Sequence, residues 1–462
     1  MDYRWLLVHI LPSIGFVLAL ILLAHILREK RPPTSTLAWL MAIVFIPYVG
    51  VPLYLVFGGR KMLSKADAKP ALKPAWGAPA IAPDTGGARL LAPDGGVFPA
   101  SATNQITLLP EGEQAFQNIL DLIRSASRSI HIATFILGKD ETGRAIMEAL
   151  ALKATQGVEV RLLLDALGSV KISRKYLSPL LSAGGQAAYF MPMIHLPFRG
   201  RANLRNHRKM LVCDGRAAVI GGMNLASEYM GPRDFPGRWR DLSLLVEGPV
   251  VDDIAGIFRS DWRFASKTPL HEQLRASPAA APEPHGVAQL VASGPDVAND
   301  SLRNAILTEI FMAKRRIWAV TPYFVPDELL LEALCIAVRR NVDVSIITPK
   351  KSNHLLADIV REGYLTRIQD AGAAVRLYEP GMLHAKALLV DDTIAMVGSA
   401  NMDMRSMLLN YEIAVCIYDS EAIAQLESWM RDLMVQSSPR KLQAGGTFGL
   451  VESVGRLFAP LL

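Results

Sequence analysis

The stretch HRKMLVCD, residues 207–214, returns later in the same chain as HAKALLVD, residues 384–391. A glycine and an asparagine follow each copy at matching positions, and matched residues lie 177 positions apart, as 384 minus 207 shows for the histidines. Five positions kept in one register are not expected by chance. The pattern therefore predicts a duplicated domain, with one copy of the motif in each half of the chain.

The segments around both motifs alternate between short apolar runs and longer patterned runs. In the first half, SIHIATFIL (129–137) and VEVRLLLD (158–165) predict strands on either side of a helix over 143–155. The second half repeats the order, with a strand over RRIWAVT (315–321) and a helix over 327–340. Such alternation is typical of α/β sheets. The sequence predicts an α/β fold in which two similar sandwich domains share one active site.

The spacing within each motif also indicates a chemistry. One residue separates the histidine from the lysine and an apolar run follows, so in an extended strand both side chains point to one face. Lysine is a compact charge that suits phosphate oxygens, and histidine can act as nucleophile, general acid or general base. The downstream glycine and asparagine allow close backbone approach and add amide donors. Two halves would place His207, Lys209, His384 and Lys386 around one anion, and a phosphodiester fits that set.

The paired H-x-K-x4-D-x6-G-x-x-N pattern resembles the phospholipase D superfamily. More narrowly, TPYFVPDE (321–328), NMDMRS (401–406), NYE (410–412) and the stretch AWLMAIVFIPYVGVPLYLVFGG resemble bacterial cardiolipin synthases, and the resemblance covers nearly the whole chain. One departure is visible, because Gly222 stands where the family usually has a serine, whereas the second repeat keeps Ser399. The departure removes one hydroxyl from the implied phosphate-binding set.

The resemblance implies a catalytic set drawn from the two motifs: His207, Lys209, Asp214, His384, Lys386 and Asp391. It implies a supporting or phosphate-binding set downstream of them: Asn224, Asn401, Ser399, Asp241 and Glu412. Family members orient each imidazole with a carboxylate, and Asp241 and Glu412 occupy the matching places. Which of them serves which histidine stays open, because the pairing can cross between the halves. Asp214 and Asp391 lie at predicted strand ends beyond the face of the histidines, which favours a structural role over direct proton transfer.

The resemblance further implies two in-line displacements at phosphorus. Unprotonated His207 attacks the phosphodiester of one phosphatidylglycerol while protonated His384 gives a proton to the departing glycerol. A second phosphatidylglycerol, deprotonated by His384 at its headgroup hydroxyl, then displaces His207 and yields cardiolipin. Lysines and asparagines would hold the nonbridging oxygens, so no cofactor, nucleotide or metal is implied. The implied partners are phosphatidylglycerol and membrane lipids, and no nucleic acid is expected.

Two other functions stay open, a lipid hydrolase and a nuclease. A hydrolytic phospholipase D would share the first step and use water in the second. A membrane-tethered nuclease would share the catalytic pairs and act on nucleic acid, but the chain has no long Lys/Arg-rich arm and no strip of alternating aromatic and basic residues. A catalytically dead membrane scaffold is disfavoured because both motifs retain every implied catalytic group.

Two apolar runs open the chain and predict a transmembrane hairpin. Trp5–Leu27 spans 23 residues and Leu37–Phe57 spans 21, each long enough to cross about 30 Å of hydrocarbon as a helix. A cleaved signal peptide is disfavoured because charged residues follow the first run without a small-residue cleavage site. Six basic residues near the outer flanks against three in the connecting loop favour a multi-pass protein of the bacterial inner membrane with cytoplasmic catalytic domains.

Length and composition agree with that organisation. At 462 residues and 51% hydrophobic, the chain can bury two domain-sized cores and still supply membrane segments. Its net charge of +6 is modest, as for an ordinary solvated surface, and also suits anionic headgroups. The three cysteines have apolar neighbours and are predicted to be buried thiols. The predicted boundaries are 1–62 for the hairpin, 63–104 and 275–290 for linkers, and 105–274 and 291–462 for the domains.

Overall fold

The structure is a computed structural model of the chain, whose described part has three long segments and several short ones. These are residues 91–191, 204–270 and 286–441, with Lys69, Leu72 and parts of the range 17–54. By its internal contacts the chain divides into two units. Unit 1 is Met1–Lys65 with Pro192–Leu204, and unit 2 is Ala66–Met191 with Arg205–Leu462.

Unit 1 contains the helix α3 (Pro33–Phe45), which ends in the apolar run LAWLMAIVF. Five apolar side chains of this unit pack together: Leu22, Ile26, Ile43, Val51 and Tyr54. Most of the first predicted span, Trp5–Leu27, and part of the second, Leu37–Phe57, lie outside the described residues. Among the residues that are described, no helix combines the length and the apolar character that a membrane crossing needs. The hairpin therefore stays a prediction.

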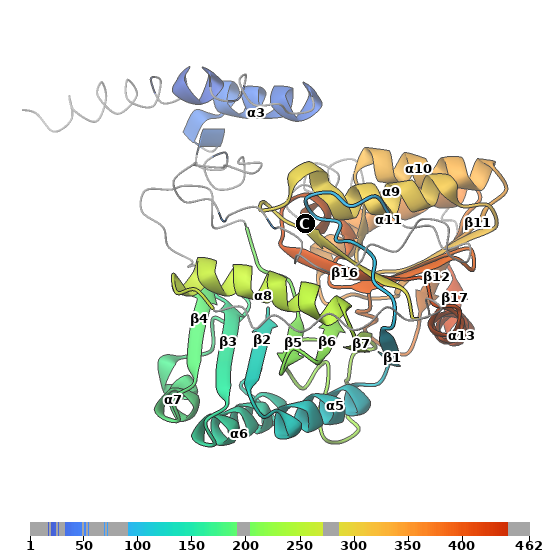
Figure 1. The fold of residues 1–462 in the computed structure, drawn as a ribbon. Helices are drawn as coiled ribbons and strands as arrows, with labels where there is room; N and C mark the ends of the chain where they lie inside the picture. The colour runs from blue at the N-terminus through green and yellow to red at the C-terminus, as the bar shows by residue number, and fades with distance from the viewer. Residues whose placement is uncertain are drawn as a thin grey trace, which may run out of the picture. The chain divides into compact units, whose positions relative to one another are not determined.

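The first motif lies in a seven-stranded sheet of unit 2, with strand order β1-β7-β6-β5-β2-β3-β4. The strands are β1 (Gln105–Leu109), β2 (Ser129–Thr134), β3 (Glu159–Asp165), β4 (Gln186–Phe190), β5 (Met210–Cys213), β6 (Ala217–Gly221) and β7 (Ser243–Glu247). Strands β2, β3 and β4 are parallel, and the others join antiparallel. The helices α5 (Gly112–Ser125), α6 (Glu141–Thr155) and α7 (Arg174–Ser182) lie on one side, and α8 (Val250–Ser266) on the other (Figure 1).

The second motif lies in an eight-stranded sheet, with strand order β17-β12-β11-β9-β13-β14-β16-β8. The strands are β8 (Ala288–Ser293), β9 (Arg316–Val320), β11 (Asp343–Pro349), β12 (Ala374–Tyr378), β13 (Ala387–Val390), β14 (Ile394–Gly398), β16 (Glu412–Ile417) and β17 (Ser437–Pro439). The helices α9 (Ser301–Met312), α10 (Glu328–Arg339) and α11 (Leu355–Asp370) cover one side, and α13 (Ser420–Val435) contacts the other (Figure 1). A short parallel pair, β10 (Phe324–Val325) with β15 (Met402–Asp403), and helix α12 (Met404–Leu408) complete this half.

The two sheets repeat one strand order, which confirms the predicted duplication and α/β class. The series β1-β7-β6-β5-β2-β3-β4 corresponds to β8-β16-β14-β13-β9-β11-β12, and β17 is an additional edge strand. Helix starts correspond as well, because Asp140 caps α6 and Asp327 caps α10 through backbone amides, a preferred N-cap arrangement. The strand predicted over 129–137 stops at Thr134, because the next residues turn to contact the loop after β6.

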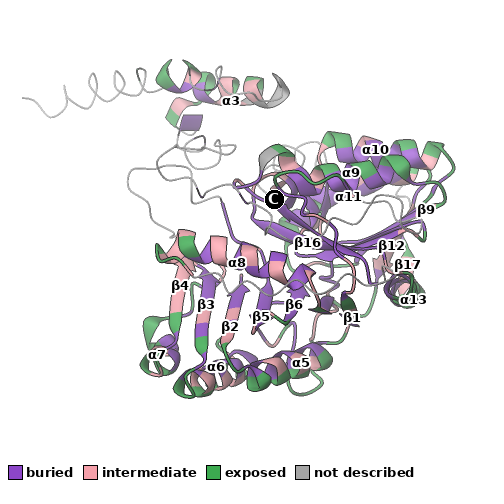
Figure 2. Cartoon of the chain, viewed as in Figure 1, coloured by how far each residue is buried: buried purple, intermediate pink, exposed green. Residues whose placement is uncertain are grey.

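Apolar strands sandwiched between helices form two hydrophobic cores in unit 2. Most strand residues are buried, while the helices keep exposed outer faces (Figure 2). This is the burial expected of sheets that are covered on both sides. The cysteines Cys213, Cys335 and Cys416 are buried thiols within these cores, as predicted.

The described end of the predicted first linker packs on the second sheet. The backbones of Ser101 and Ala288 exchange two hydrogen bonds of 2.9 Å, and Leu91 N donates to Gln289 Oε1 at 3.2 Å. Leu91 and Val97 join the second core. Composition predicted a linker here because the apolar residues lack a helix or strand period. They are buried because they cover β8, which would otherwise be an open edge.

Candidate active site

The two motifs meet where each half of unit 2 pairs with the other. His207 N donates to Tyr411 O at 2.9 Å, and His384 N donates to Arg240 O at 2.7 Å. Each contact belongs to a single-residue parallel bridge between the halves. The motif strands β5 and β13 begin directly after the lysines. The backbone of each histidine is therefore held by the opposite half.

Each imidazole contacts a carboxylate that also comes from the opposite half. His207 Nδ1 lies 3.0 Å from Oε1 and 3.2 Å from Oε2 of Glu412. His384 Nδ1 lies 2.7 Å from Oδ2 of Asp241. Burial opposes ionisation of both carboxyls, but the facing imidazoles and lysines hold the pKa of each below its usual range. The pairing that the sequence left open is thus crossed.

Burial favours the neutral form of both imidazoles. Burial lowers the pKa of His207 and outweighs the attraction of Glu412. Burial, together with the Lys386 ammonium, lowers the pKa of His384 to about 3 in spite of Asp241. A carboxylate that accepts a hydrogen bond from Nδ1 selects the tautomer in which Nε2 carries the lone pair. Each ring can therefore act as a nucleophile or a base through Nε2.

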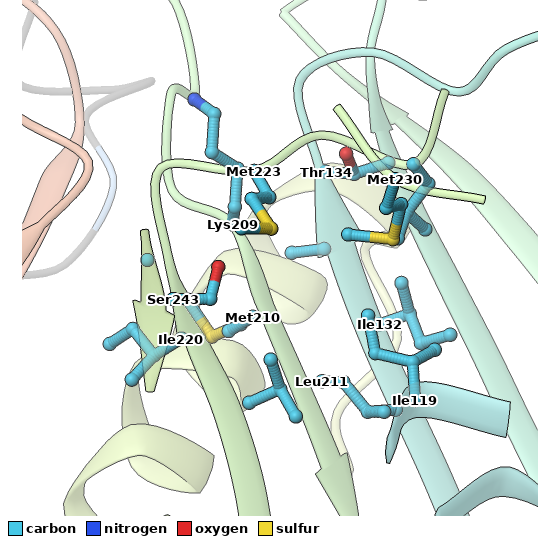
Figure 3. Close-up of a pocket in the computed structure, with 14 residues that line it drawn as sticks. Ile119, Ile132, Thr134, Lys209, Met210, Leu211, Ile220, Met223, Met230 and Ser243 are labelled. Atoms are coloured by element: carbon cyan, nitrogen blue, oxygen red, sulfur yellow. The ribbon is translucent and has the colours of Figure 1, made fainter. Parts of the chain in front are cut away.

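The two lysines bring positive charge beside the rings. Lys209 Nζ donates to His207 O at 2.6 Å, and Lys386 Nζ lies 2.7 Å from Nδ1 and 3.1 Å from Nε2 of His384. The stem of Lys209 runs past Met223, away from the apolar pocket beneath it (Figure 3). Burial lowers the pKa of Lys209 to about 7 and that of Lys386 to about 8. Both amines would regain full charge beside an anion, so the arrangement suits a phosphate.

The two carboxylates are held by different hydrogen bonds. In the first half, Leu242 N donates directly to Asp241 Oδ1 at 2.7 Å. In the second half, Ile413 N donates to Ser399 Oγ at 3.1 Å, and this hydroxyl donates to Glu412 Oε2 at 2.6 Å. The amide that follows each carboxylate therefore reaches it directly in one half and through a serine in the other.

This difference accounts for Gly222, the departure from the family pattern. A Cβ atom at position 222 would lie 2.2 Å from Asp241 Oδ1. The shorter carboxylate of Asp241 thus occupies the space that a serine side chain would need. The hydroxyl of Ser399 bonds Glu412 in the second half, so the glycine changes how a carboxylate is held.

The two asparagines lie beyond the ends of β6 and β14 and are buried. Asn224 Oδ1 accepts a hydrogen bond from Ile136 N at 3.0 Å. Asn401 Nδ2 donates to Asp403 Oδ2 at 2.9 Å. Burial raises the pKa of Asp403 to about 6, although Asn401 and a backbone amide oppose the shift. Sequence reasoning missed Asp403, whose position in the first repeat is held by Ala226.

The motif aspartates lie at the far ends of β5 and β13 from the histidines. The Asp214 carboxylate accepts the backbone amides of residues 127–129 at 2.7–2.8 Å. The Asp391 carboxylate accepts those of residues 314–316 at 2.8–3.0 Å. Each aspartate has a positive φ, 53° and 51° respectively, and begins the turn after its strand. These contacts tie that turn to the start of β2 or β9 and favour the structural role.

The family model described as "Cardiolipin synthase, PLD-like domain" matches residues 119–262 and 306–434, which include both motifs. The chain belongs to the cardiolipin synthase family. It is a phospholipase D-type phosphatidyltransferase, and the family predicted from the motifs is confirmed. The model described as "Phospholipase_D-nuclease N-terminal" matches residues 17–59. Together these matches indicate a membrane-associated enzyme.

Individual relatives extend over almost the whole chain. The cardiolipin synthase of Geobacillus thermodenitrificans is 35% identical over 453 residues, which cover 94% of this chain and 90% of the relative. Cardiolipin synthase 1 of Bacillus anthracis is 35% identical over 461 residues, with the same two shares. The crystal structure of a phosphatidylserine synthase from Haemophilus influenzae matches with a TM-score of 0.56 and 17% identity, over 77% of this chain and 93% of that one. The last match supports the fold.

Aromatic rings that the sequence did not single out pack against the imidazoles of this synthase. The Phe135 ring centroid lies 4.9 Å from that of His207. The centroids of Tyr229 and Trp239 lie 5.1 Å and 5.4 Å from that of His384. Such ring contacts add packing around both imidazoles. The sequence signal was weak, because an aromatic residue near a motif is usually part of a core.

A buried ion cluster lies behind the first motif and was also missed. Lys69 Nζ lies 2.5 Å from Asp261 Oδ1 and also contacts Asp296. Arg208 donates to Asp261 at 2.8 Å and to Glu412 O at 3.2 Å. Two cations and two carboxylates, whose side chains are each at most 1% exposed, compensate one another. Arg208 stands between His207 and Lys209, so the strand period points it away from them and into this cluster.

Proposed function

We propose that this enzyme transfers a phosphatidyl group from one phosphatidylglycerol to another, giving cardiolipin and glycerol through a phosphatidyl-histidine intermediate. The observation that carries the proposal is the crossed pairing of His207 with Glu412 and of His384 with Asp241. Two neutral imidazoles, each oriented by a carboxylate, supply a nucleophile on one side of a phosphodiester and a proton carrier on the other. The conclusion extends the family assignment to a defined reaction.

In the first step, Nε2 of His207 attacks phosphorus as the bond to the glycerol oxygen breaks. His384 gives that oxygen a proton, and glycerol leaves. The free-enzyme pKa of His384 is low because burial and the Lys386 ammonium disfavour its charged form. An anionic phosphodiester beside Lys386 offsets this repulsion, so substrate binding promotes protonation of His384. Glu412 stabilises the charge that develops on His207.

In the second step, His384 takes the proton of the headgroup hydroxyl of a second phosphatidylglycerol. The resulting oxygen attacks phosphorus, the bond to His207 breaks, and cardiolipin forms. One phosphodiester replaces another, so the reaction is close to isoenergetic. Lys209 and Lys386 hold the nonbridging oxygens in both steps, with Asn224 and Asn401 lining the same region.

We assign the remaining site residues a structural role, in which they position other parts of the site. Asp214 and Asp391 hold the turns that follow the motif strands, through the amide contacts at residues 127–129 and 314–316. Ser399 positions the Glu412 carboxylate. None of the three takes part in proton transfer in this scheme.

We also propose the membrane arrangement that the sequence predicts. The runs Trp5–Leu27 and Leu37–Phe57 cross the bacterial inner membrane, and the catalytic domains 105–274 and 291–462 are cytoplasmic. Support comes from the apolar lengths of both runs, from the excess of basic residues on their outer flanks, and from the N-terminal family match. Protease protection of a C-terminal tag in sealed inverted vesicles would contradict this orientation.

The decisive experiment is to incubate the purified full chain with labelled phosphatidylglycerol in mixed micelles, without nucleotide, and to analyse the lipids by mass spectrometry. Cardiolipin with stoichiometric glycerol is expected. His207→Asn and His384→Asn should abolish it while the protein stays folded by circular dichroism. Phosphatidic acid as the sole product would mean a hydrolase, and unchanged turnover in either variant would exclude this site.

A further inference from the structure

Two loops that follow equivalent strands flank the active site. The first follows β3, where Asp165 accepts the amide of Asn206, next to His207, at 3.0 Å. In the same loop, Ser169 Oγ donates to Phe135 O at 2.9 Å, and the Phe135 ring packs on His207. This loop is therefore fastened to the first half of the site.

The second loop follows β11 and leads into helix α11. The Tyr323 hydroxyl bonds Asn353, and its ring centroid lies 5.7 Å from that of His354. Helix α11 packs on β10, whose partner β15 directly follows Asn401. Strands β3 and β11 correspond in the two sheets. Both loops therefore follow the carboxyl ends of these strands, which is the end of each sheet where the site lies.

Both loops expose apolar side chains next to basic ones. The first rim is defined by Leu167 and Val170, which are 46% and 57% exposed, with three exposed basic residues directly after them: Lys171, Arg174 and Lys175. The second rim is defined by Leu355, Leu356 and Ile359, which are 76%, 43% and 37% exposed. Two exposed basic residues, Lys350 and Lys351, lie a few positions earlier in the same loop, and Lys350 also pairs with Glu379.

The second rim is one side of a helix start. In α11, Ile359 follows Leu355 by four positions and Leu356 by three, so it neighbours both leucines on the helix surface. The helix buries its other side through Val360 and Tyr364 against Val325. Exposed leucines at the start of a helix lower the solubility of a protein. Their clustering beside lysines is typical of surfaces that lie in the headgroup region of anionic membranes.

We propose that the two rims dock on an anionic phospholipid bilayer, with the apolar side chains among the acyl chains and the basic side chains on the headgroups. The proposal rests on the proposed function, because the substrate then resides in the surface that the rims contact. Docking on both sides of the site lets a phospholipid headgroup reach the histidines while its acyl chains stay largely in the bilayer. The charge of the rims selects bilayers that contain phosphatidylglycerol.

The test compares two forms of phosphatidylglycerol with the full chain. One is long-chain lipid in phosphatidylcholine vesicles, and the other is a short-chain analogue below its critical micelle concentration. Substituting the second rim (Leu355→Ser, Leu356→Ser and Ile359→Ser together) should lower the ratio of vesicle to monomer activity by about tenfold. Leu167→Ser with Val170→Ser should act in the same direction.

Matched controls come from exposed apolar residues at the opposite ends of the sheets. Leu152 is 58% exposed near the end of α6, and Phe311 is 43% exposed near the end of α9. Each lies close to the amino end of the strand that follows its helix, which is the end of the sheet away from the site. Leu152→Ser and Phe311→Ser should leave the ratio unchanged. An environment-sensitive dye on Leu355→Cys should shift to the blue with phosphatidylglycerol vesicles, whereas the same dye on Leu152→Cys should not.

The outcomes separate the two proposals. A vesicle-to-monomer ratio that is equal in wild type and rim variants would overturn the docking surface while monomer turnover still supports the transferase. A wild type that turns over neither substrate would instead remove the proposed function. A third outcome is that the wild type forms a dimer in detergent solution, the rim variants do not, and the activity ratio is unchanged. The rims would then bind a second copy of the chain, and the lipid surface would be overturned.

Discussion

The Nδ1 atom of His384 lies 2.7 Å from Oδ2 of Asp241, although the two residues are 143 positions apart and belong to different halves of the chain. The reciprocal contact joins His207 and Glu412, 205 positions apart. Neither half therefore holds a complete imidazole and carboxylate pair. The single site exists because the two copies of the domain exchange their carboxylates.

The crossed pairs predict that each carboxylate is needed for activity. Asp241→Asn and Glu412→Gln keep the shape but cannot stabilise an imidazolium or select the required tautomer, so cardiolipin formation should fall by about 10²–10⁴-fold. The measurement is kcat per folded molecule in mixed micelles. Asp121→Asn, at an exposed carboxylate on α5, is the control and should be neutral. Near-normal kcat in either test variant would remove that carboxylate from the mechanism.

The order of the histidines can be tested with a phosphatidyl donor that carries p-nitrophenol, a leaving group that needs no general acid. His384→Asn should release about one equivalent of nitrophenol and then stop, because His207 is still phosphatidylated but no base activates the acceptor. Peptide mapping should find the phosphatidyl group on His207. His207→Asn should show no burst. A burst in His207→Asn with the label on His384 would reverse the assignment.

The two ways of holding a carboxylate predict a rescue. Ser399→Gly leaves Ile413 N and Glu412 without their shared partner and should lower kcat about 10- to 100-fold, as expected for a lost buried hydrogen bond of about 1–3 kcal/mol. Adding Glu412→Asp reproduces the arrangement of Gly222 with Asp241 and should recover much of the loss.

The reverse substitution provides the control for that rescue. Gly222→Ser should inactivate the enzyme, because its Cβ would approach Asp241 Oδ1 to 2.2 Å. The readouts are kcat, KM and the pH profile, since a change confined to stability would leave all three intact in the folded fraction. If the variant with both Ser399→Gly and Glu412→Asp is no more active than Ser399→Gly alone, the two arrangements are not equivalent.

The buried lysines predict an alkaline limit to activity. The pKa values of about 7 for Lys209 and about 8 for Lys386 describe the free enzyme, so kcat/KM should fall as pH rises through this range and the amines lose their charge. Bound phosphodiester favours the charged amines, so the alkaline limb of kcat should lie at higher pH than that of kcat/KM. Coincident limbs would show that the lysines do not bind the phosphate.

The motif aspartates predict a stability effect with a defined pH dependence. Asp214→Asn and Asp391→Asn should each lower the free energy of unfolding by about 1–3 kcal/mol at pH 7, because each carboxylate accepts three backbone amides. The folded pKa of both carboxyls is lowered by these amides, against the effect of burial. Their contribution is therefore present above the unfolded pKa near 4 and is lost as pH falls through the folded value.

Chemical denaturation of each variant at pH 7 and at pH 3 measures this difference. The gap from wild type should be smaller at pH 3. Asp392→Asn is the matched control, because Asp392 is 54% exposed and bonds arginines at the surface, where such pairs contribute about 0–1 kcal/mol. A gap that does not change with pH would mean that the ionised form is not what the amides stabilise.

Much of the fold could be predicted because its signals are local. The strands over 158–165 and 315–321 and the helix over 327–340 were predicted almost to the residue, since apolar runs and caps act within a few positions. The exposure of residues 91–101 could not be judged in this way. Their burial depends on β8, almost 200 positions away in the chain, and no local period records such a contact.

The sequence by itself determined three features of this enzyme: a repeated histidine and lysine at strand spacing, a duplicated α/β domain and the cardiolipin synthase family. Tertiary structure alone decided which carboxylate serves which histidine, why Gly222 and Ser399 differ, and where Arg208 and Lys69 place their charge. The reason is physical. Spacing along a strand fixes which side chains share a face, whereas the partners of those side chains come from segments that meet only after both halves have folded against each other.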